Sequence, residues 1–290
     1  MPIDRTGSRP WPALAWPALA LAALAVAAGC ALLVALGAPS RMPIVNGAAL
    51  LVGLVGVGAI RGLRRFGLTV RAGDAALLAA SILLPLTAIA APDAGGMARW
   101  LVVGGLTLLP GMIVVPLVAI GAALRPSPVR TAAALVAAFG LALQPDPGGA
   151  AMLLAGLAGP LLFAKRPRPL DLAGVVGAAI GLAVAQSRSV VLPMVPFVEH
   201  VLPDALAAGI VPALLALASA AFLLAPGITR ASRAASLAFL GTWTAALAMA
   251  LLGPYPTPVI GFGGSGVVGY VLGAGLLALG TARCAVAKDR

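Results

Sequence analysis

Proline, glycine and clusters of charged residues divide the sequence into ten apolar stretches. A helix needs about 20 residues to cross the hydrocarbon core of a bilayer, and somewhat fewer when it is packed inside a bundle. No large soluble domain fits between the stretches, so we expect an all-α integral membrane protein, a single polytopic domain over residues 1–290. The ten predicted spans are 11–37, 43–60, 72–91, 101–124, 129–144, 148–164, 171–187, 203–225, 230–252 and 259–282.

The composition agrees with this class. Hydrophobic residues make up 61% of the chain and charged residues 9%, and the mean hydropathy is +1.09, which is outside the range of soluble proteins. The 19 Lys and Arg residues outnumber the 8 Asp and Glu residues. In a soluble chain this excess would suggest a nucleic-acid partner, but in a membrane protein basic residues first report topology. We therefore expect no nucleic-acid binding.

The distribution of basic residues predicts the orientation of the chain in the membrane. With ten spans and a cytoplasmic N-terminus, 16 basic residues are inside and three are outside, as the positive-inside rule requires. Both termini are then cytoplasmic. The external basic residues are Arg41, Arg99 and Arg188, and the external acidic residues are Asp93, Asp146, Glu199 and Asp204.

Three motifs occur at predicted external helix ends. They are "RWLVVGGLTLLP" from Arg99 to Pro110, "LQPDPGGA" from Leu143 to Ala150, and "TPVIGFGGSG" from Thr257 to Gly266. The "GFGGSG" part satisfies a dinucleotide-binding pattern, but it follows no strand and opens no βαβ unit. Its small residues are more consistent with close helix packing or with backbone that bends near a cavity.

These motifs resemble the SEDS family of cell-wall polymerases, the FtsW/RodA/SpoVE group. "RWLVVGGLTLLP" is similar to that family's "RW…G…P-S-E", "LQPDPGGA" to its "QPDLGTA", and "TPVIGFGGSG" to its "LPLISYGGSS". The motifs occur in the family's order, and the resemblance is clearest over residues 95–279. It implies the ten-span fold, a location in the bacterial inner membrane and a role in peptidoglycan synthesis during cell growth or division.

The resemblance also implies a chemistry. Family members polymerise lipid II, a polyprenyl-diphosphate-linked precursor, and usually pair with a single-pass transpeptidase. Such a reaction needs a carboxylate to deprotonate the acceptor hydroxyl and cations to hold the departing diphosphate. Arg99 is the candidate cation, and Trp100 offers a face for a sugar or a polyprenyl chain. No cofactor and no metal ligands are expected, except a divalent cation if the protein is active.

The sequence departs from the family at the positions that carry this chemistry. The family's glutamate and lysine after "P-S" correspond to Met112 and Val115, and its presumed catalytic aspartate corresponds to Val198. Its paired glutamates correspond to Leu206 and Ala207, and most of its long external loop is missing. We therefore favour a shortened, divergent member with degraded or absent transferase activity.

The main alternative is an active transferase with a relocated base. Glu199 and His200 directly follow the position of the lost aspartate, and a carboxylate beside an imidazole can act as a base. Because one residue rotates a helical side chain by about 100°, Glu199 can replace the aspartate only in a non-helical segment. A small-solute transporter is a weaker alternative, since no span carries a charge at its centre.

The candidate site combines these residues. We predict Glu199 as the catalytic residue, and the predicted ligand-binding residues are Arg99, Trp100, Gln144, Asp146 and His200. The predicted structural positions of the motifs are Pro110, Pro145, Gly148, Pro258, Gly263, Gly264 and Ser265.

Several of these residues also have a purely structural interpretation. Asp146 between two prolines is typical of a helix-cap residue, and Gln144 could satisfy free backbone groups. Glu199 and His200 could be solvated loop residues, and Asp204 could cap the eighth span. For Arg99 the alternative is an anchor to lipid head groups.

Overall fold

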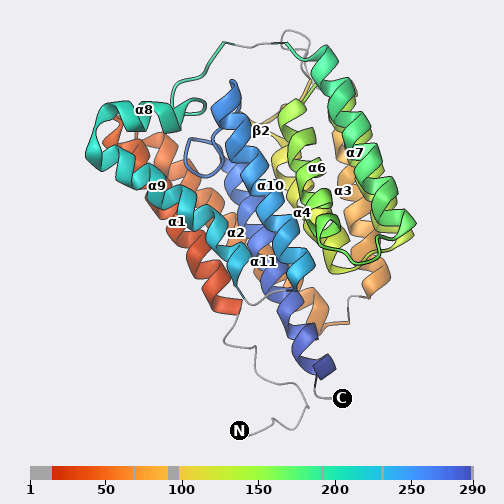
Figure 1. The fold of residues 1–290 in the computed structure, drawn as a ribbon. Coiled ribbons are helices and arrows are strands. Elements are labelled where there is room, and N and C mark those ends of the chain that lie inside the picture. The colour runs from red at the N-terminus through yellow and green to blue at the C-terminus, as the bar shows by residue number, and fades with distance from the viewer. Residues whose placement is uncertain (1–14, 68, 91–97, 191–192, 230–231, 289–290) are drawn as a thin grey trace, which may run out of the picture.

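The structure is a computed structural model, which describes residues 15–67, 69–90, 98–190, 193–229 and 232–288, with side chains from Pro17 to Gly280. It is a bundle of helices with one small hairpin (Figure 1). The elements are α1 (Ala15–Ala35), α2 (Arg41–Arg65), α3 (Val70–Ala90), β1 (Leu101–Val103), β2 (Leu106–Leu108), α4 (Pro110–Leu124), α5 (Pro128–Leu143), α6 (Pro147–Leu162), α7 (Pro169–Arg188), α8 (Val201–Ala208), α9 (Ile210–Leu224), the 3₁₀ helix η1 (Ala225–Ile228), α10 (Arg233–Leu252) and α11 (Gly264–Lys288).

Ten of these helices correspond one to one with the ten predicted spans. Among the described residues, six helices are long and apolar enough to cross a membrane, and four shorter apolar helices complete the set. The shorter ones are α4, α5, α6 and the described part of α11. α1 begins and α11 ends at the same end of the bundle (Figure 1). The prediction of an all-α membrane protein is therefore confirmed.

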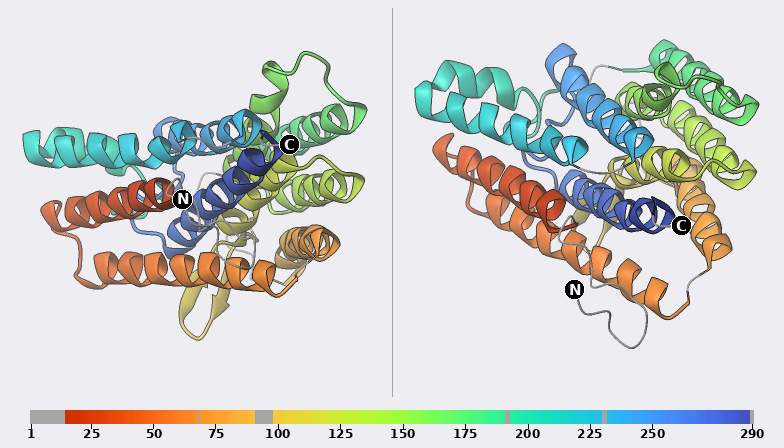
Figure 2. Two further views of the ribbon diagram at one scale, coloured as in Figure 1. Left: turned by 90° about the horizontal axis from the view of Figure 1, so that it is seen from below. Right: turned by 60° about the horizontal axis from the view of Figure 1, so that its bottom comes forward.

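Three of the predicted spans start too early by five residues or more. The fourth span is predicted to begin at residue 101. Residues 101–108 instead form an antiparallel hairpin, in which Val102 pairs with Thr107. Its turn is made by Gly104 and Gly105, both with positive φ (57° and 79°), a conformation that glycine adopts readily and that two-residue hairpins require. The hairpin protrudes from the side of the bundle (Figure 2, left). The fourth span therefore starts at Pro110.

The eighth and tenth spans also start later than predicted. Gly209, with a φ of 124°, separates the short helix α8 from α9, so the eighth span begins at Ile210 instead of residue 203. Residues 259–263 form a loop, and α11 begins at Gly264. Apolar sequence alone cannot separate helix from apolar loop, so these boundaries were not visible in the hydrophobic pattern.

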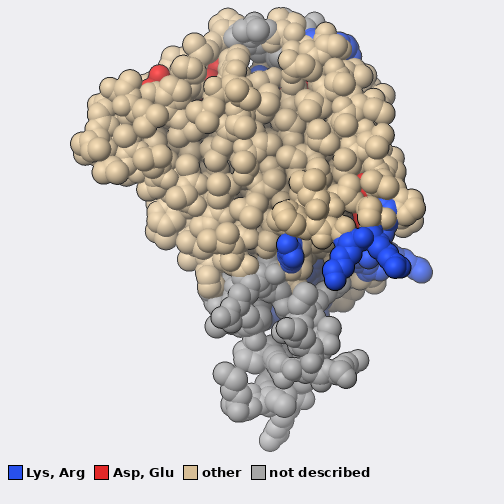
Figure 3. All heavy atoms as spheres, viewed as in Figure 1, with Lys and Arg blue, Asp and Glu red and all other residues tan. Residues whose placement is uncertain are grey.

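Charge is distributed along the bundle as the predicted orientation requires. On the face seen in Figure 3, Lys and Arg side chains gather mainly at the end where α1 begins. This end carries the α6–α7 connection with Lys165, Arg166 and Arg168. We therefore describe it as the cytoplasmic end, and the opposite end as the external end.

α11 lies at the centre of the bundle, where it packs against α1, α2 and α4 (Figure 2, right). An aromatic cluster lies between it and α10. The ring centroids of Trp243 and Tyr270 are 5.3 Å apart with perpendicular planes, and Phe239 lies 5.9 Å from Tyr270. The Tyr270 hydroxyl donates to the carbonyl of Phe222 at 2.9 Å, so its polar atom is satisfied inside the core.

Glycines bring α6 and α10 into backbone contact. A Cβ added at Gly241 of α10 would overlap the carbonyl oxygen of Ala155 in α6. On α6, a Cβ at Gly159 would lie 2.7 Å from the carbonyl oxygen of Leu237. Small residues of this kind allow transmembrane helices to approach closely, and they fix the distance between the two helices.

We expect Gly241→Ala to lower the free energy of unfolding by about 1–3 kcal/mol, the usual cost of overpacking a filled interior. The measurement is thermal unfolding of the purified protein in detergent. Gly58→Ala is the control, because a Cβ at this helical position in α2 meets nothing within 4 Å. Equal melting temperatures for both variants would contradict the close approach of α6 and α10.

The orientation can be tested with alkaline phosphatase, which is active only after export. A fusion after Lys165, in the α6–α7 connection, is expected to be inactive. A fusion after Ser189, directly after α7, is expected to be active. The opposite pattern would invert the topology and with it the assignment of the external end.

Candidate functional site

Four segments that are distant in the sequence meet at the external end of the bundle. The segment after α7 is bonded to the loop between α10 and α11. The N–H of Thr257 donates to the carbonyl of Val198 at 2.8 Å, and the N–H of Phe262 donates to the carbonyl of Phe197 at 2.6 Å. Glu199 and Pro256 form an isolated antiparallel bridge. The entry to the hairpin and the α5–α6 turn complete the group.

Side chains hold the "GFGGSG" loop in place. Asn46 of α2 is fully buried, and its amide donates to the carbonyl of Gly261 at 2.9 Å while its oxygen accepts from the N–H of Gly263 at 3.1 Å. Ser265 accepts from the N–H of Leu109 at 2.9 Å. The sequence analysis missed Asn46, although it is the only asparagine in the chain and interrupts an apolar stretch. The motif is thus held by α2 and by the residue that precedes α4.

Arg99 is the centre of this external site. Its side chain is buried, with the residue only 2% exposed. Nη1 lies 3.5 Å from Oδ1 of Asp146, a long contact for an ion pair. Its Nε is buried and has no hydrogen-bond partner among the described residues. The guanidinium carbon lies 4.5 Å from the ring centroid of Trp100 and 5.9 Å from that of Tyr255, within range of cation–π attraction.

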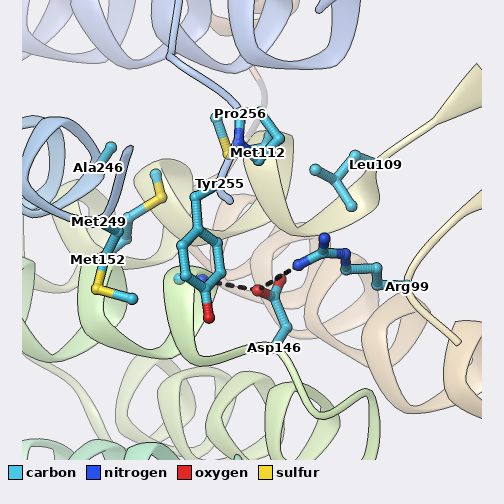
Figure 4. A pocket seen from close by; sticks show the side chains of 11 residues that line it. Arg99, Leu109, Met112, Asp146, Met152, Ala246, Met249, Tyr255 and Pro256 are labelled. Atoms are coloured by element: carbon cyan, nitrogen blue, oxygen red, sulfur yellow. Dashed lines mark hydrogen bonds and ion pairs between the residues drawn. The ribbon is translucent and has the colours of Figure 1, made fainter. Parts of the chain in front are cut away.

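Asp146 has two roles in the structure. Its Oδ1 accepts from the N–H of Gly149 at 3.1 Å and so caps the N-terminus of α6, as the structural interpretation of the sequence expected. The same carboxylate contacts Arg99, and both side chains line a small cavity (Figure 4). The cap orients the carboxylate, and the ion pair then links the start of α6 to the entry of the hairpin.

The cavity beside this pair has a largely apolar wall. Its volume is about 20 Å³, which is room for about one water molecule. Three methionines, Met112, Met152 and Met249, lie along it. Met112 occupies the position of the family's glutamate, so the structure places a flexible thioether where the resemblance implies a charge.

Tyr255 is a further member of the site that the sequence analysis missed. It lines the cavity, and a Cβ at Gly148 would lie 2.5 Å from its ring, so the glycine of "LQPDPGGA" makes room for it. Burial and the charge of Asp146 raise the pKa of Tyr255 to about 12. The phenol therefore stays protonated at neutral pH and remains a hydrogen-bond donor.

The remaining motif residues lie at helix ends, in turns or between helices, and not in the lining of the cavity. Pro110 and Gly264 are the first residues of α4 and α11, and Pro145 directly precedes the cap residue. Pro258 lies in a turn, and its carbonyl accepts a hydrogen bond from the N–H of Ile260 at 2.7 Å. Gln144 is fully buried and donates to the carbonyl of Leu84 in α3 at 2.7 Å, which is a structural contact away from the cavity lining.

Glu199 lies next to the cavity without lining it. The residue is 7% exposed, so it is not the solvated loop residue of the structural interpretation. Its Oε2 accepts from the N–H of Val195 at 2.9 Å. Burial raises the pKa of the Glu199 carboxyl, while this hydrogen bond and the charge of Arg99 act in the opposite direction. The segment is made of turns and a bridge instead of a helix, which meets the condition for a relocated base.

His200 and Asp204 lie away from the cavity. His200 is exposed and its Nδ1 lies 3.8 Å from Oδ1 of Asp204. Asp204 lies inside the first turn of α8, whose N-cap is His200. The eighth span corresponds to α9, whose N-cap is Gly209, so the expectation that Asp204 caps the eighth span is wrong. In the described part of the chain, no group of three or more His, Cys, Asp and Glu residues is close enough to hold a metal ion.

The comparisons with known proteins concern the whole chain. No protein-family model and no curated protein sequence matches it. The structure is similar to the rod shape determining protein RodA of Thermus thermophilus, with a TM-score of 0.60, 21% identity and coverage of 93% of this chain and 97% of RodA. A mutant form of the same RodA gives a TM-score of 0.62, 21% identity and coverage of 93% and 98%.

A third match is a chain from a structure described as "Structural coordination of polymerization and crosslinking by a peptidoglycan synthase complex". Its TM-score is 0.58 at 23% identity, with coverage of 94% of this chain and 99% of that chain. In each match, nearly the full length of both chains is covered. The similarity therefore concerns the whole bundle and not a single helix pair. The chain is therefore a multi-pass membrane protein with the fold of RodA, as the resemblance to the SEDS family predicts.

Proposed function

We propose that this chain is a SEDS-like protein of cell-envelope synthesis in the bacterial inner membrane. In this proposal its external site binds the diphosphate of a polyprenyl-linked sugar precursor, and its glycosyltransferase activity is degraded or absent. The single observation that carries the proposal is the state of Arg99. A buried guanidinium with a free Nε and only one long ion pair among the described residues has unused capacity to bind an anion.

The surroundings of Arg99 support an anionic ligand that carries a sugar. Guanidinium groups bind phosphate oxygens in a bidentate fork. Tyr255 supplies a neutral hydroxyl donor beside the cavity, and the ring of Trp100 lies against the guanidinium. The diphosphate would bind the Nε of Arg99, which has no hydrogen-bond partner among the described residues, while Asp146 keeps its 3.5 Å contact with Nη1.

Three positions support a loss of transferase activity. Met112 lines the cavity where the resemblance implies a glutamate. Val115, at the position of the lysine, is fully buried in the hydrophobic core. Val198, at the position of the catalytic aspartate, contributes its backbone carbonyl to the loop contact with Thr257. None of these side chains can accept a proton or pair with a charge.

The alternative is an active transferase in which Glu199 is the base. The observation that favours it is the raised pKa of the buried Glu199 carboxyl near Arg99, since a higher pKa makes a stronger proton acceptor at neutral pH. In that case Asp146 and the diphosphate would share a divalent cation, because Mg²⁺ is often held by one or two carboxylates and substrate phosphates. The Glu199 side chain would have to leave the N–H of Val195.

We further propose a partner protein in the same membrane. The support is the similarity to a chain from a structure described as a peptidoglycan synthase complex for polymerisation and crosslinking. By this analogy the partner carries the crosslinking activity, as a single-pass transpeptidase would. A precursor-binding protein without transferase activity would then serve as a membrane platform for that partner.

Arg99→Ala is expected to weaken binding of a polyprenyl-diphosphate sugar about ten- to hundredfold. A charge-assisted hydrogen bond is worth about 1.5–3 kcal/mol, and each 1.4 kcal/mol is about tenfold in affinity. Arg99→Lys should retain part of the affinity, because it keeps the charge and loses the fork. The measurement is a titration of the purified protein in detergent.

Arg41→Ala is the matched control for this titration. Arg41 is also external, is exposed, and begins α2 away from the cavity. If Arg99 is only an anchor to lipid head groups, Arg99→Ala and Arg41→Ala will weaken binding equally little. That result would contradict the proposed site.

The purified protein is expected to form no glycan polymer from lipid II in the presence of a divalent cation. The reason is the absence of a carboxylate at the position of the lost aspartate. An active SEDS polymerase under the same conditions is the positive control, and product length on a gel is the measurement. Polymer that disappears in Glu199→Gln, while precursor binding persists, would replace this proposal with the active alternative.

A further inference from the structure

A second and much larger cavity lies at the cytoplasmic end of the bundle. Its volume is about 270 Å³, compared with about 20 Å³ at the external site. It lies between the last turns of α4 and α6 and the first turns of α5 and α7. Small residues, among them Ala119, Ala134 and Gly156, form part of its wall. No residue of the external site takes part in it.

The wall and the rim of this cavity differ in character. Besides the alanines and Gly156, the wall carries Leu157 and Pro160. The rim carries three arginines, Arg130, Arg166 and Arg168, and one acidic residue, Asp171. A cavity with an apolar wall and a basic rim fits a ligand that has both an apolar part and a negative charge.

Arg130 is already neutralised. Its Nε donates to Oδ1 of Asp74 at 2.6 Å, and its Nη1 donates to the carbonyl of Gly121. Ser127 is 3.4 Å from the other carboxylate oxygen of Asp74. This network joins α3, α4 and α5 and makes one side of the rim rigid. The positive charge available to a ligand therefore comes from Arg166 and Arg168.

The sequence "RPRP", residues 166–169, presents these two arginines to the same space. Both line the cavity, whereas the neighbouring Lys165 and Pro167 do not. Arg166 lies in a bend and Arg168 has an extended backbone, with φ −86° and ψ 149°, and both side chains reach the cavity. Prolines on either side of Arg168 restrict the backbone. Neither arginine makes an ion pair with a described residue, and together they outweigh Asp171.

We propose that this cavity binds the phosphate head group of an anionic phospholipid of the inner leaflet, with Arg166 and Arg168 on the phosphate and the first part of the lipid against the apolar wall. Arginine forks suit phosphate oxygens. The cavity is at the cytoplasmic end, where anionic lipids attract basic residues. A free phosphate ion would use only the rim, so the apolar wall favours a lipid. This site is independent of the proposed precursor site at the external end.

The test is native mass spectrometry of the full chain titrated with dioctanoyl phosphatidylglycerol. The variant Arg166→Ala/Arg168→Ala is expected to bind this lipid about 10- to 30-fold more weakly than the wild type, from the loss of two basic residues near the phosphate. The control is Arg71→Ala/Arg125→Ala. It removes the same charge from two exposed arginines at the cytoplasmic end that do not line the cavity, and it should bind like the wild type.

Two further arms distinguish the source of the phosphate. Ala123→Leu places a larger side chain in the wall of the cavity. It is expected to weaken lipid binding without changing the melting temperature. If the lipid were attracted only to arginines at the surface, this substitution would not change its binding. Inorganic phosphate should not compete with the lipid at equal concentration. Equal losses in both double variants, or equal competition by inorganic phosphate, would overturn the proposal.

Discussion

The external end of this protein depends on one buried cation. Arg99 is taken out of water between the hairpin and α6, and among the described residues Asp146 is its ion-pair partner. Removing one partner of a buried ion pair typically costs about 3–5 kcal/mol, because the other charge is left without compensation. Under the proposed function, the diphosphate of the ligand would use this buried charge through the Nε of Arg99, which has no hydrogen-bond partner among the described residues.

The bilayer explains how the loops around Arg99 are built. Backbone groups near the hydrocarbon core need internal partners, and three polar side chains provide them. Asn46 bonds both the carbonyl of Gly261 and the N–H of Gly263. Ser265 accepts from the N–H of Leu109, and Gln144 donates to a carbonyl of α3. Asn46 and Ser265 thus satisfy backbone groups outside the helices, and Gln144 joins the end of α5 to α3.

The sequence predicted the class and the ten long apolar helices, because hydrophobic length and charge bias act over whole segments. It failed where apolar residues form something other than a helix. Gly104 and Gly105 turn an apolar run into a hairpin, and Gly209 divides another into two helices. Within the site, Arg99 and Asp146 could be predicted from unusual charge. Tyr255 could not, because its position depends on the space left by Gly148, which no local pattern records.

The two cavities share helices but are separated by close packing. α4 and α6 contribute Met112 and Met152 to the external cavity, and Ala119 and Gly156 to the cytoplasmic one. At the boundary, a Cβ on Gly156 would overlap Thr242 of α10 and lie 2.7 Å from the Cβ of Ala119. A path for a solute would require these helices to separate where almost no side chain lies between them. Because packed interiors resist such openings, the transporter interpretation is disfavoured, and the two anion sites that we propose would lie at opposite ends of a rigid frame.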